Sequence, residues 1–249
     1  FLISMNIELI FPVLNEANSL VRQLTKVREF ISKISDYKFI ITVVDNGSTD
    51  NTKSITNKLI EENIVDKYNY LSERGRGRAI KVAINKSNCD IVAYMDIDLS
   101  TELIFLRPLI ESISKGGNDI SIGSRLSKGS KVIGRKKIRE ITSRSYNILI
   151  KFFFPFSRID DMQCGFKAFS RKKAFHLIQN VTNNKWFFDT EIIILARSLN
   201  YKIDQIPVKW TDDPNTTVNI VTTAIEDIVG LIKLRLKSVS YTHLTLPTN

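Results

Sequence analysis

The chain has few of the residues that build disulfide frameworks and zinc sites. Its 249 residues include two cysteines, Cys89 and Cys164, and two histidines, His176 and His243. Two cysteines so far apart in sequence give no disulfide framework and suit a reducing cytosol. With no Cys-x-x-Cys pair and so few histidines, we do not expect a zinc site.

Long hydrophobic runs are also lacking. No stretch reaches the roughly 18 apolar residues that indicate a membrane-spanning helix. The two most apolar segments, 146–156 and 220–236, are interrupted by charged residues, so we expect core or interfacial segments there. No signal peptide, internal repeat or low-complexity linker is visible.

Both ends of the sequence depart from the pattern of the rest. Met5 is the expected start, which leaves 1–4 as upstream sequence. The segment 240–249 (SYTHLTLPTN) breaks the preceding helical pattern, and we expect a non-native tail there. A native chain that continues further could carry a membrane-spanning segment at its C-terminus.

What is present suits a soluble globular protein, with 43% apolar and 25% charged residues. We expect one domain, 5–237, with halves 5–124 and 125–237. The net charge of +10 is uneven, because 125–144 holds eight Lys or Arg against one acid. Such a patch suits nucleic acid, an anionic membrane or a phosphorylated substrate.

The first half alternates apolar strands with amphipathic helices. The expected strands are 7–13, 39–44, 66–71, 90–95 and 119–123, and the expected helices are 15–34, 51–62, 76–86 and 102–115. This alternation predicts an α/β fold with a mostly parallel sheet covered by helices on both faces. Ligands of such sheets bind beyond the carboxyl ends of the strands, where Pro12, Asp45, Asp96 and Ser124 fall.

The regular alternation of strands and helices ends after residue 125. A basic loop leads to an aromatic-rich helix (141–154), a short helix (171–178) and a segment whose first residues, 186–188, are strand-like before it turns helical. A further strand (201–208) and a C-terminal amphipathic helix (220–236) follow.

Two aspartates at the end of a buried strand are the most informative feature. In YMDIDLST, Asp96 and Asp98 directly follow the apolar run 91–95. Carboxylates there can hold Mg²⁺ or Mn²⁺ against a phosphate-bearing ligand. An isolated Asp-x-Asp is also compatible with a solvated strand end.

Three further motifs lie at other strand ends. They are FPVLNE with Pro12, Asn15 and Glu16, VVDNGSTDNT with Asp45, Gly47 and Ser48, and ERGRGRAI with Arg74 and Arg78. A carboxylate such as Asp45 can accept hydrogen bonds from a ribose or a uracil-like edge. The glycine turn and the helix start after it offer free backbone N–H groups, and the basic turn could approach a pyrophosphate.

In this order and spacing, the four motifs resemble the nucleotide-sugar-binding half of inverting family-2 glycosyltransferases of the GT-A fold. Three later motifs, DMQCGFK (161–167), WFFDTE (186–191) and IPVKW (206–210), resemble the dolichyl-phosphate glucosyltransferase branch and its bacterial polyprenyl-phosphate relatives. The Gln-x-x-Arg-Trp motif of processive synthases is absent. Two departures from the family pattern are Asn46, where a second acid is usual, and the segment 212–219.

The resemblance implies inverting transfer of a hexose, with UDP-glucose as the expected donor, to a polyprenyl monophosphate at the cytoplasmic face of a membrane. Asp98 with Asp96 would hold Mg²⁺ or Mn²⁺, and Asp45 would orient the nucleoside. Asp189 is the position for a general base, should one be needed. The expected phosphate and sugar ligands are Arg74, Arg78, Arg125, Arg139, Arg144, Gln163, Cys164, Gly165 and Lys167.

Three alternatives stay open. A soluble family-2 transferase would act on a glycan or protein hydroxyl and would require a true base. A mannosyltransferase-like enzyme would use GDP-mannose. A nucleic-acid-binding module fits poorly, because the basic segment lacks interleaved aromatics and the strand ends are acidic.

Overall fold

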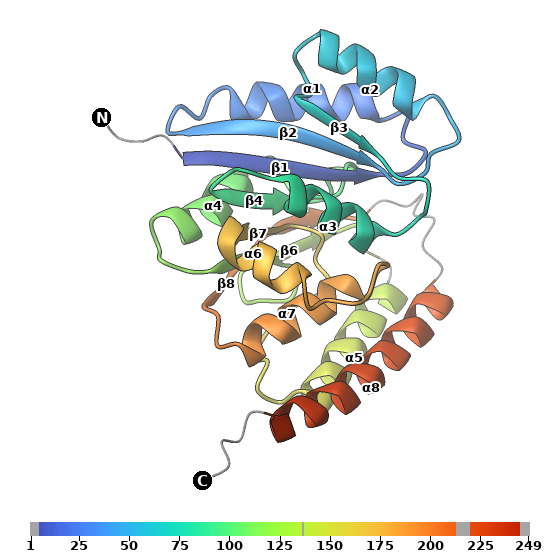
Figure 1. Cartoon of the computed structure of the whole chain (residues 1–249), viewed down its shortest axis with the longest axis vertical. Helices are drawn as coiled ribbons and strands as arrows, with labels where there is room; N and C mark the ends of the chain where they lie inside the picture. Colours follow the sequence, from blue (N-terminus) through green and yellow to red (C-terminus); the bar gives the residue numbers. More distant parts are fainter. Residues whose placement is uncertain (1–4, 136, 213–219, 245–249) are drawn as a thin grey trace.

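The structure is a computed structural model that describes residues 5–135, 137–212 and 220–244, with the backbone alone for 137–139, 220–223 and 237–244. Its centre is a seven-stranded sheet in the order β3-β2-β1-β4-β7-β5-β8 (Figure 1). The strands of this sheet are β1 (Met5–Val13), β2 (Tyr37–Asp45), β3 (Lys67–Tyr70), β4 (Ile91–Tyr94), β5 (Ile120–Ser124), β7 (Lys167–Ser170) and β8 (Ile203–Pro207).

The predicted mostly parallel sheet is confirmed. β1 pairs in parallel with β2 and β4, β2 with β3, and β5 with β8. Side chains alternate between the two faces of a strand, so Ile7 and Leu9 enter one core cluster while Ile10 enters the other. Because both faces of these strands are buried, they appear in the sequence as the apolar runs from which they were predicted.

One strand of the sheet was not predicted. β7 lies between β4 and β5 and runs antiparallel to both. Its first residue, Lys167, is opposite Tyr94 on one side and Ile122 on the other. Because β7 and β8 belong to the second half of the chain, the two halves share one sheet.

Helices cover both faces, as expected. One face carries α1 (Leu20–Ile31), α2 (Thr52–Glu61) and α4 (Leu106–Ser114), whose apolar residues join the cluster of Ile7. The other face carries α3 (Arg76–Lys86), α5 (Lys137–Phe153), α6 (Arg171–Ile178) and α7 (Phe188–Ser198). The core therefore forms two layers, one on each side of the sheet.

The C-terminal helix α8 (Ile220–Leu244) packs beside α5 (Figure 1). Its backbone stays helical beyond residue 236, where the sequence indicated an end, so the helix reaches into 240–249. Among the described residues, no helix combines the length and apolar character that a bilayer crossing requires.

A second small sheet pairs β6 (Lys131–Ile133) with β9 (Lys209–Thr211). Neither strand was predicted separately. The strand-like interpretation of 186–188 is wrong, because Trp186 and Phe187 lie in a turn before α7, which begins at Phe188. Aromatic residues favour strands, but here Phe187 and Phe188 are buried against helices, and that packing overrides the propensity.

Candidate active site

The Asp-x-Asp pair leaves the sheet directly after β4. The Asp96 side chain is 45% exposed, and its Oδ1 accepts hydrogen bonds from Nη2 (2.7 Å) and Nε (3.2 Å) of Arg76. No described residue donates a hydrogen bond to Oδ2 of Asp96. That oxygen lies over Gly165, where a Cβ would come within 1.9 Å of it. Any larger residue at position 165 would therefore displace the Asp96 carboxylate or the Arg76 guanidinium.

Asp98 is held in a tight turn. Its Oδ1 accepts a hydrogen bond from the backbone N–H of Ser100 (2.9 Å), and its Oδ2 accepts one from the Ser100 hydroxyl (2.7 Å). Both aspartates line one pocket beyond the end of β4. The pocket is lined by Met95, Asp96, Asp98, Ser100, Thr101, Gly165, Phe166 and Trp210.

The donor set fits a hard divalent cation. Mg²⁺ and Mn²⁺ prefer oxygen ligands, and Asp96 and Asp98 bring carboxylate oxygens to the same pocket. Within the described part of the chain, no cluster of three or more Asp, Glu, His or Cys residues could hold a metal. A cation bound here would keep coordination positions for phosphate oxygens and water.

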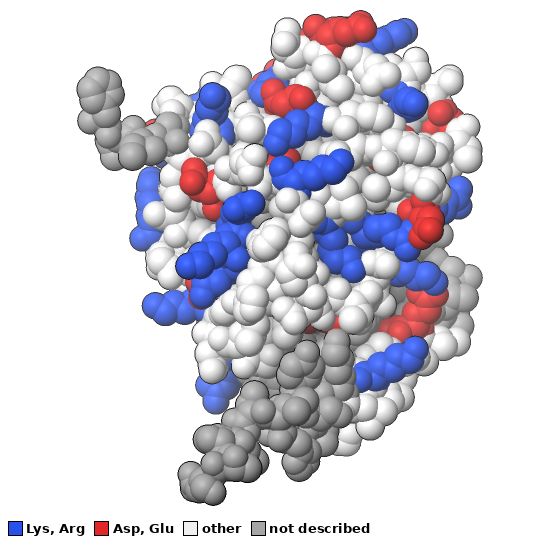
Figure 2. All heavy atoms as spheres, viewed as in Figure 1, with Lys and Arg blue, Asp and Glu red and all other residues white. Residues whose placement is uncertain are grey.

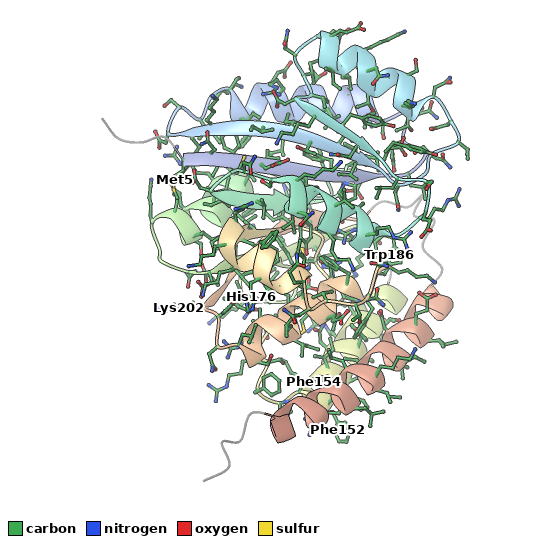
Figure 3. The ribbon with its side chains drawn as sticks, in the orientation of Figure 1. Met5, Phe152, Phe154, His176, Trp186 and Lys202 are labelled. Carbon is green, nitrogen blue, oxygen red and sulfur yellow. The ribbon has the colours of Figure 1, made fainter. Side chains whose placement is uncertain are left out.

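Arg76 links the Asp-x-Asp pair to a buried acid. It is the first residue of α3, is 7% exposed, and donates to both Asp96 and Asp189. Its guanidinium lies over the rings of Tyr94 (5.6 Å) and Trp186 (5.4 Å). Burial alone would lower the pKa of Arg76, but the two carboxylates raise it above its ordinary value, so it stays charged. Trp186 is labelled in Figure 3.

The sequence predicted Arg74 and Arg78 as site residues, but not Arg76, which lies between them. Arg74 is exposed, and Arg78 pairs with Glu73. The available signal was the position of Arg76 at the start of a helix between Gly75 and Gly77, where close backbone packing fixes the side chain. A Cβ on Gly77 would come within 2.5 Å of the Phe188 side chain.

Asp189 sits in the centre of this network and is 2% exposed. It accepts hydrogen bonds from Arg76, from the Tyr94 hydroxyl (2.6 Å) and from Lys167, which is fully buried. Burial raises the pKa of Asp189, but the charges of Arg76 and Lys167 outweigh this and hold it below its usual range. Its role as a base stays a prediction, and the structure shows it as a buried counter-ion.

Asp45 ends β2 and is fully enclosed. Its Oδ1 accepts from the N–H of Ser48 (2.8 Å) and its Oδ2 from the hydroxyl of Tyr68 (2.8 Å). Burial, followed by the hydrogen bond to Asp45, raises the pKa of Tyr68. Gly47 has φ of +80°, a left-handed conformation that favours glycine. Contact between Asp45 and a nucleoside stays a prediction, and it would require this turn to open.

The FPVLNE motif is tied to the same turn. Pro12 is opposite Val44 in the β1–β2 register. The Asn15 side-chain oxygen accepts from the N–H of Thr49 (2.8 Å), and the N–H of Asn15 donates to the Ser48 hydroxyl (2.9 Å). The N–H of Glu16 donates to Thr52 (3.0 Å). The structure thus brings these two predicted motifs together.

Asn46, one of the departures from the family pattern, connects this turn to the glycine-rich loop. Its side-chain oxygen accepts a hydrogen bond from the N–H of Gly75 (2.6 Å), the residue before Arg76. The amide oxygen of Asn46 therefore accepts a hydrogen bond that a carboxylate oxygen at this position could also accept.

Arg125 is already paired. Its guanidinium forms a two-pronged contact with Asp161, from Nε to Oδ2 (2.6 Å) and from Nη2 to Oδ1 (2.8 Å), and it lies over Trp210 at 5.4 Å. Arg144 is 60% exposed and pairs with Glu140 at 3.0 Å. The side chain of Arg139 lies outside the described residues. Phosphate binding by these three residues stays a prediction.

The segment Gln163–Gly165 lies beside the pocket, which Gly165 lines. Gln163 donates to Oδ2 of Asp227 on α8 (2.6 Å), while Cys164 is buried and its carbonyl accepts from Lys167 (2.7 Å). Burial raises the pKa of Cys164 to about 12, so its thiol is inert at neutral pH. Burial also raises the pKa of Asp227 to about 7.

A family profile described as "Glycosyl transferase family 2" matches residues 8–177. The chain belongs to this family. Glycosyltransferase AglD of Haloferax volcanii is 32% identical over 90% of this chain, which spans 35% of AglD. Dolichyl-phosphate beta-glucosyltransferases of Saccharomyces cerevisiae and Homo sapiens are 27% and 28% identical over 92% and 83% of this chain, which spans 74% and 67% of their lengths.

Solved structures confirm the GT-A fold of this family 2 glycosyltransferase. Glucosyl-3-phosphoglycerate synthase of Mycobacterium tuberculosis, crystallised with Mn²⁺, UDP and its product, matches with a TM-score of 0.67 at 16% identity, over 93% of this chain and 80% of that one. Mannosyl-3-phosphoglycerate synthase of Rubrobacter xylanophilus matches with a TM-score of 0.69 at 14% identity, over 95% and 75%. At these identities the likeness concerns the fold alone.

Proposed function

We propose that this glycosyltransferase transfers a hexose from a nucleotide diphosphate sugar, UDP-glucose in the first instance, to a polyprenyl monophosphate with inversion. The observation that carries the proposal is the pocket beyond β4, in which Asp96 presents an open oxygen beside Asp98. The relatives named dolichyl-phosphate beta-glucosyltransferase support the acceptor class. The M. tuberculosis neighbour, crystallised with UDP and Mn²⁺, supports the donor class.

In the proposed reaction an oxygen of the acceptor phosphate attacks the anomeric carbon of the sugar, and the bond from that carbon to the nucleotide diphosphate breaks. Asp96 and Asp98 would hold Mg²⁺ or Mn²⁺, which stabilises the negative charge that develops on the leaving diphosphate. Arg76 keeps Asp96 oriented, because it donates two hydrogen bonds to that carboxylate while its guanidinium also contacts the rings of Tyr94 and Trp186.

A phosphate acceptor removes the need for a strong base. Its second pKa is about 6, so most of it is ionised at neutral pH and it needs positioning rather than deprotonation. This fits the environment of Asp189, whose oxygens are already occupied by Arg76, Lys167 and Tyr94. A hydroxyl acceptor would instead require a base with a free oxygen at the pocket.

The exposed surfaces of α5 and α8 support the proposal that the protein attaches to a membrane surface. Phe152 on α5, labelled in Figure 3, is 81% exposed, and Leu236 on α8 is 67% exposed. Other exposed apolar residues of the two helices are Ile141, Ile148, Ile225, Ile228, Val229 and Ile232. Exposed basic residues lie on the same helices, namely Arg144, Lys151, Lys233 and Arg235. Apolar stripes flanked by Lys and Arg are typical of interfacial helices on anionic lipid. We place this surface on the cytoplasmic leaflet.

Nucleic acid is not among the proposed partners. Basic side chains are interspersed with acidic ones on the face that Figure 2 shows. The basic segment 125–144 contains no aromatic residue on which bases could stack, and the pocket beyond β4 is lined by two carboxylates.

A metal-dependent transfer assay tests the proposal. Purified protein receives radiolabelled UDP-glucose or GDP-mannose, a polyprenyl phosphate, and Mn²⁺ or Mg²⁺. We expect lipid-extractable label from UDP-glucose that disappears with EDTA. If only GDP-mannose gives lipid-extractable label, the proposed donor becomes GDP-mannose in place of UDP-glucose. Nucleotide-sugar binding without a lipid product would move the acceptor to a soluble glycan or protein.

A further inference from the structure

Arg135 is a half-buried guanidinium with unused donors. It lies between β6 and α5, over the ring of Trp210 at 5.7 Å, and its Nη2 donates to the hydroxyl of Ser143. Its Nε and Nη1 are buried and have no hydrogen-bond partner. No acidic residue of the described chain forms an ion pair with it. Buried donors normally have partners, so these two need an explanation.

The contrast with Arg125 makes the missing partner specific. Both guanidinium groups lie over the same indole of Trp210, but Arg125 is neutralised by Asp161 and Arg135 has only a hydroxyl. Burial and then the charge of Arg125 lower the pKa of Arg135, while Asp161, Asp212 and Glu140 offset this in part. Arg135 therefore lacks the directly bonded carboxylate that Arg125 has, and its buried Nε and Nη1 could donate to the oxygens of a bound anion.

Trp210 contacts Arg135 and also lines the pocket. The same residue lines the pocket together with Asp96 and Asp98, and it forms an isolated bridge with Thr101. An anion held by Arg135 would therefore lie next to Trp210, close to the proposed site of sugar transfer. Guanidinium forks match phosphate oxygens well, because their parallel N–H groups can bind two oxygens.

We propose that Arg135, backed by Trp210, binds the phosphate of the prenyl acceptor, and that Arg125 with Asp161 is its structural support. The inference rests on the proposed function and names a residue that the sequence motifs did not. The position favours the acceptor over the donor, because Arg135 leads directly into α5, which exposes Ile141, Ile148 and Phe152 along its length. A prenyl chain attached to the phosphate would find that apolar surface beside it.

The test compares four proteins, namely wild type, Arg135→Gln, Arg135→Lys and the matched control Lys131→Gln, an exposed lysine of the same basic segment. Tryptophan fluorescence follows titration with farnesyl phosphate, with farnesol, and with UDP plus Mn²⁺. Thermal unfolding establishes whether each variant is folded. If Arg135→Gln does not fold, Arg135→Lys replaces it in the comparison.

We expect Arg135→Gln to weaken farnesyl phosphate binding at least tenfold while UDP binding changes less than twofold. Arg135→Lys should fall between, since it keeps the charge and loses the fork, and Lys131→Gln should match wild type. Unchanged farnesyl phosphate binding in Arg135→Gln would overturn the inference and leave the proposed function standing. An equal loss of UDP binding would assign the residue to the donor diphosphate instead.

A wild-type protein that binds UDP but no farnesyl phosphate would overturn both the acceptor class and this inference. Binding of farnesol as strong as that of farnesyl phosphate would also overturn it, because the phosphate would then contribute nothing.

Discussion

In the first half of the chain the charged and apolar groups near the site have partners within the protein, whereas in the second half several do not. Arg76 contacts two carboxylates and two aromatic rings, while Arg135 has only a hydroxyl and an indole. Exposed apolar residues of the first half, such as Val21 and Ile104, are scattered, whereas those of α5 and α8 follow one another along the helices. The proposed contacts with the acceptor and with a membrane surface therefore both fall in the second half.

The largest effect is expected at Asp96 and Asp98, the proposed metal ligands. Asp98→Asn removes a negative charge from the pocket and keeps the shape of the turn at Ser100. Because the proposed cation would contribute several kcal/mol to transition-state stabilisation, we expect kcat to fall about 1,000-fold or more, with little change in Tm. The measurement is the transfer assay with Mn²⁺ titration. Asp36→Asn, an exposed acid that pairs with Arg107, is the control, and a normal rate in Asp98→Asn would remove the basis of the proposed function.

The next effect concerns the pairing of Arg76 in the first half with Asp189 in the second half. Arg76→Gln leaves Asp189 buried with one cation fewer, and breaking one partner of a buried pair costs about 3–5 kcal/mol. We expect this loss of unfolding free energy in urea together with reduced turnover. Lys86→Gln, on the same helix but exposed, should change stability by less than about 0.5 kcal/mol. Equal stability of the two variants would show that the network is not buried.

The apolar surface of the second half gives the third prediction. Phe152→Ser removes a side chain whose burial is worth about 1.5–3 kcal/mol, so binding to anionic liposomes should weaken about tenfold or more. Its Tm should hardly change, because the residue packs little in the free protein. Phe175→Ser, a partly exposed phenylalanine of α6, is the control in the same cosedimentation assay. If both variants bind liposomes like wild type, the surface has another purpose.

The smallest effect is a pH dependence at Asp227, where α8 meets Gln163. Its folded pKa of about 7 lies above the unfolded value of about 3.9, so the folded state binds the extra proton. Stability from this group is full at low pH and is lost as pH rises from about 4 through 7. Asp227→Asn should therefore gain stability relative to wild type at pH 8 and lose that advantage at pH 5, measured by urea unfolding. Glu226→Gln, an exposed neighbour paired with Lys185, should show no such trend.

The sequence predicted the first half well, because strands such as β1 and β4 are short, buried, mostly apolar runs bounded by polar residues. It predicted the second half less well. β6 and β9 are three residues long and are not buried, and β7 begins with a lysine, so none of the three shows the apolar run that marks β4. Among the candidate site residues, Asp96 and Asp98 reach a common pocket, whereas Arg125 and Lys167 turn out to be engaged in ion pairs.

By itself, the sequence determined that Asp96 and Asp98 would leave a buried strand at the ligand-binding edge of an α/β sheet, because apolar periodicity and strand ends are local properties. Tertiary structure alone decided which charges meet there. Arg76 and Asp189 are 113 positions apart, and the antiparallel insertion of β7 brings Gly165 and Lys167 beside them. Contacts over such separations depend on how whole elements pack, and no local pattern records them.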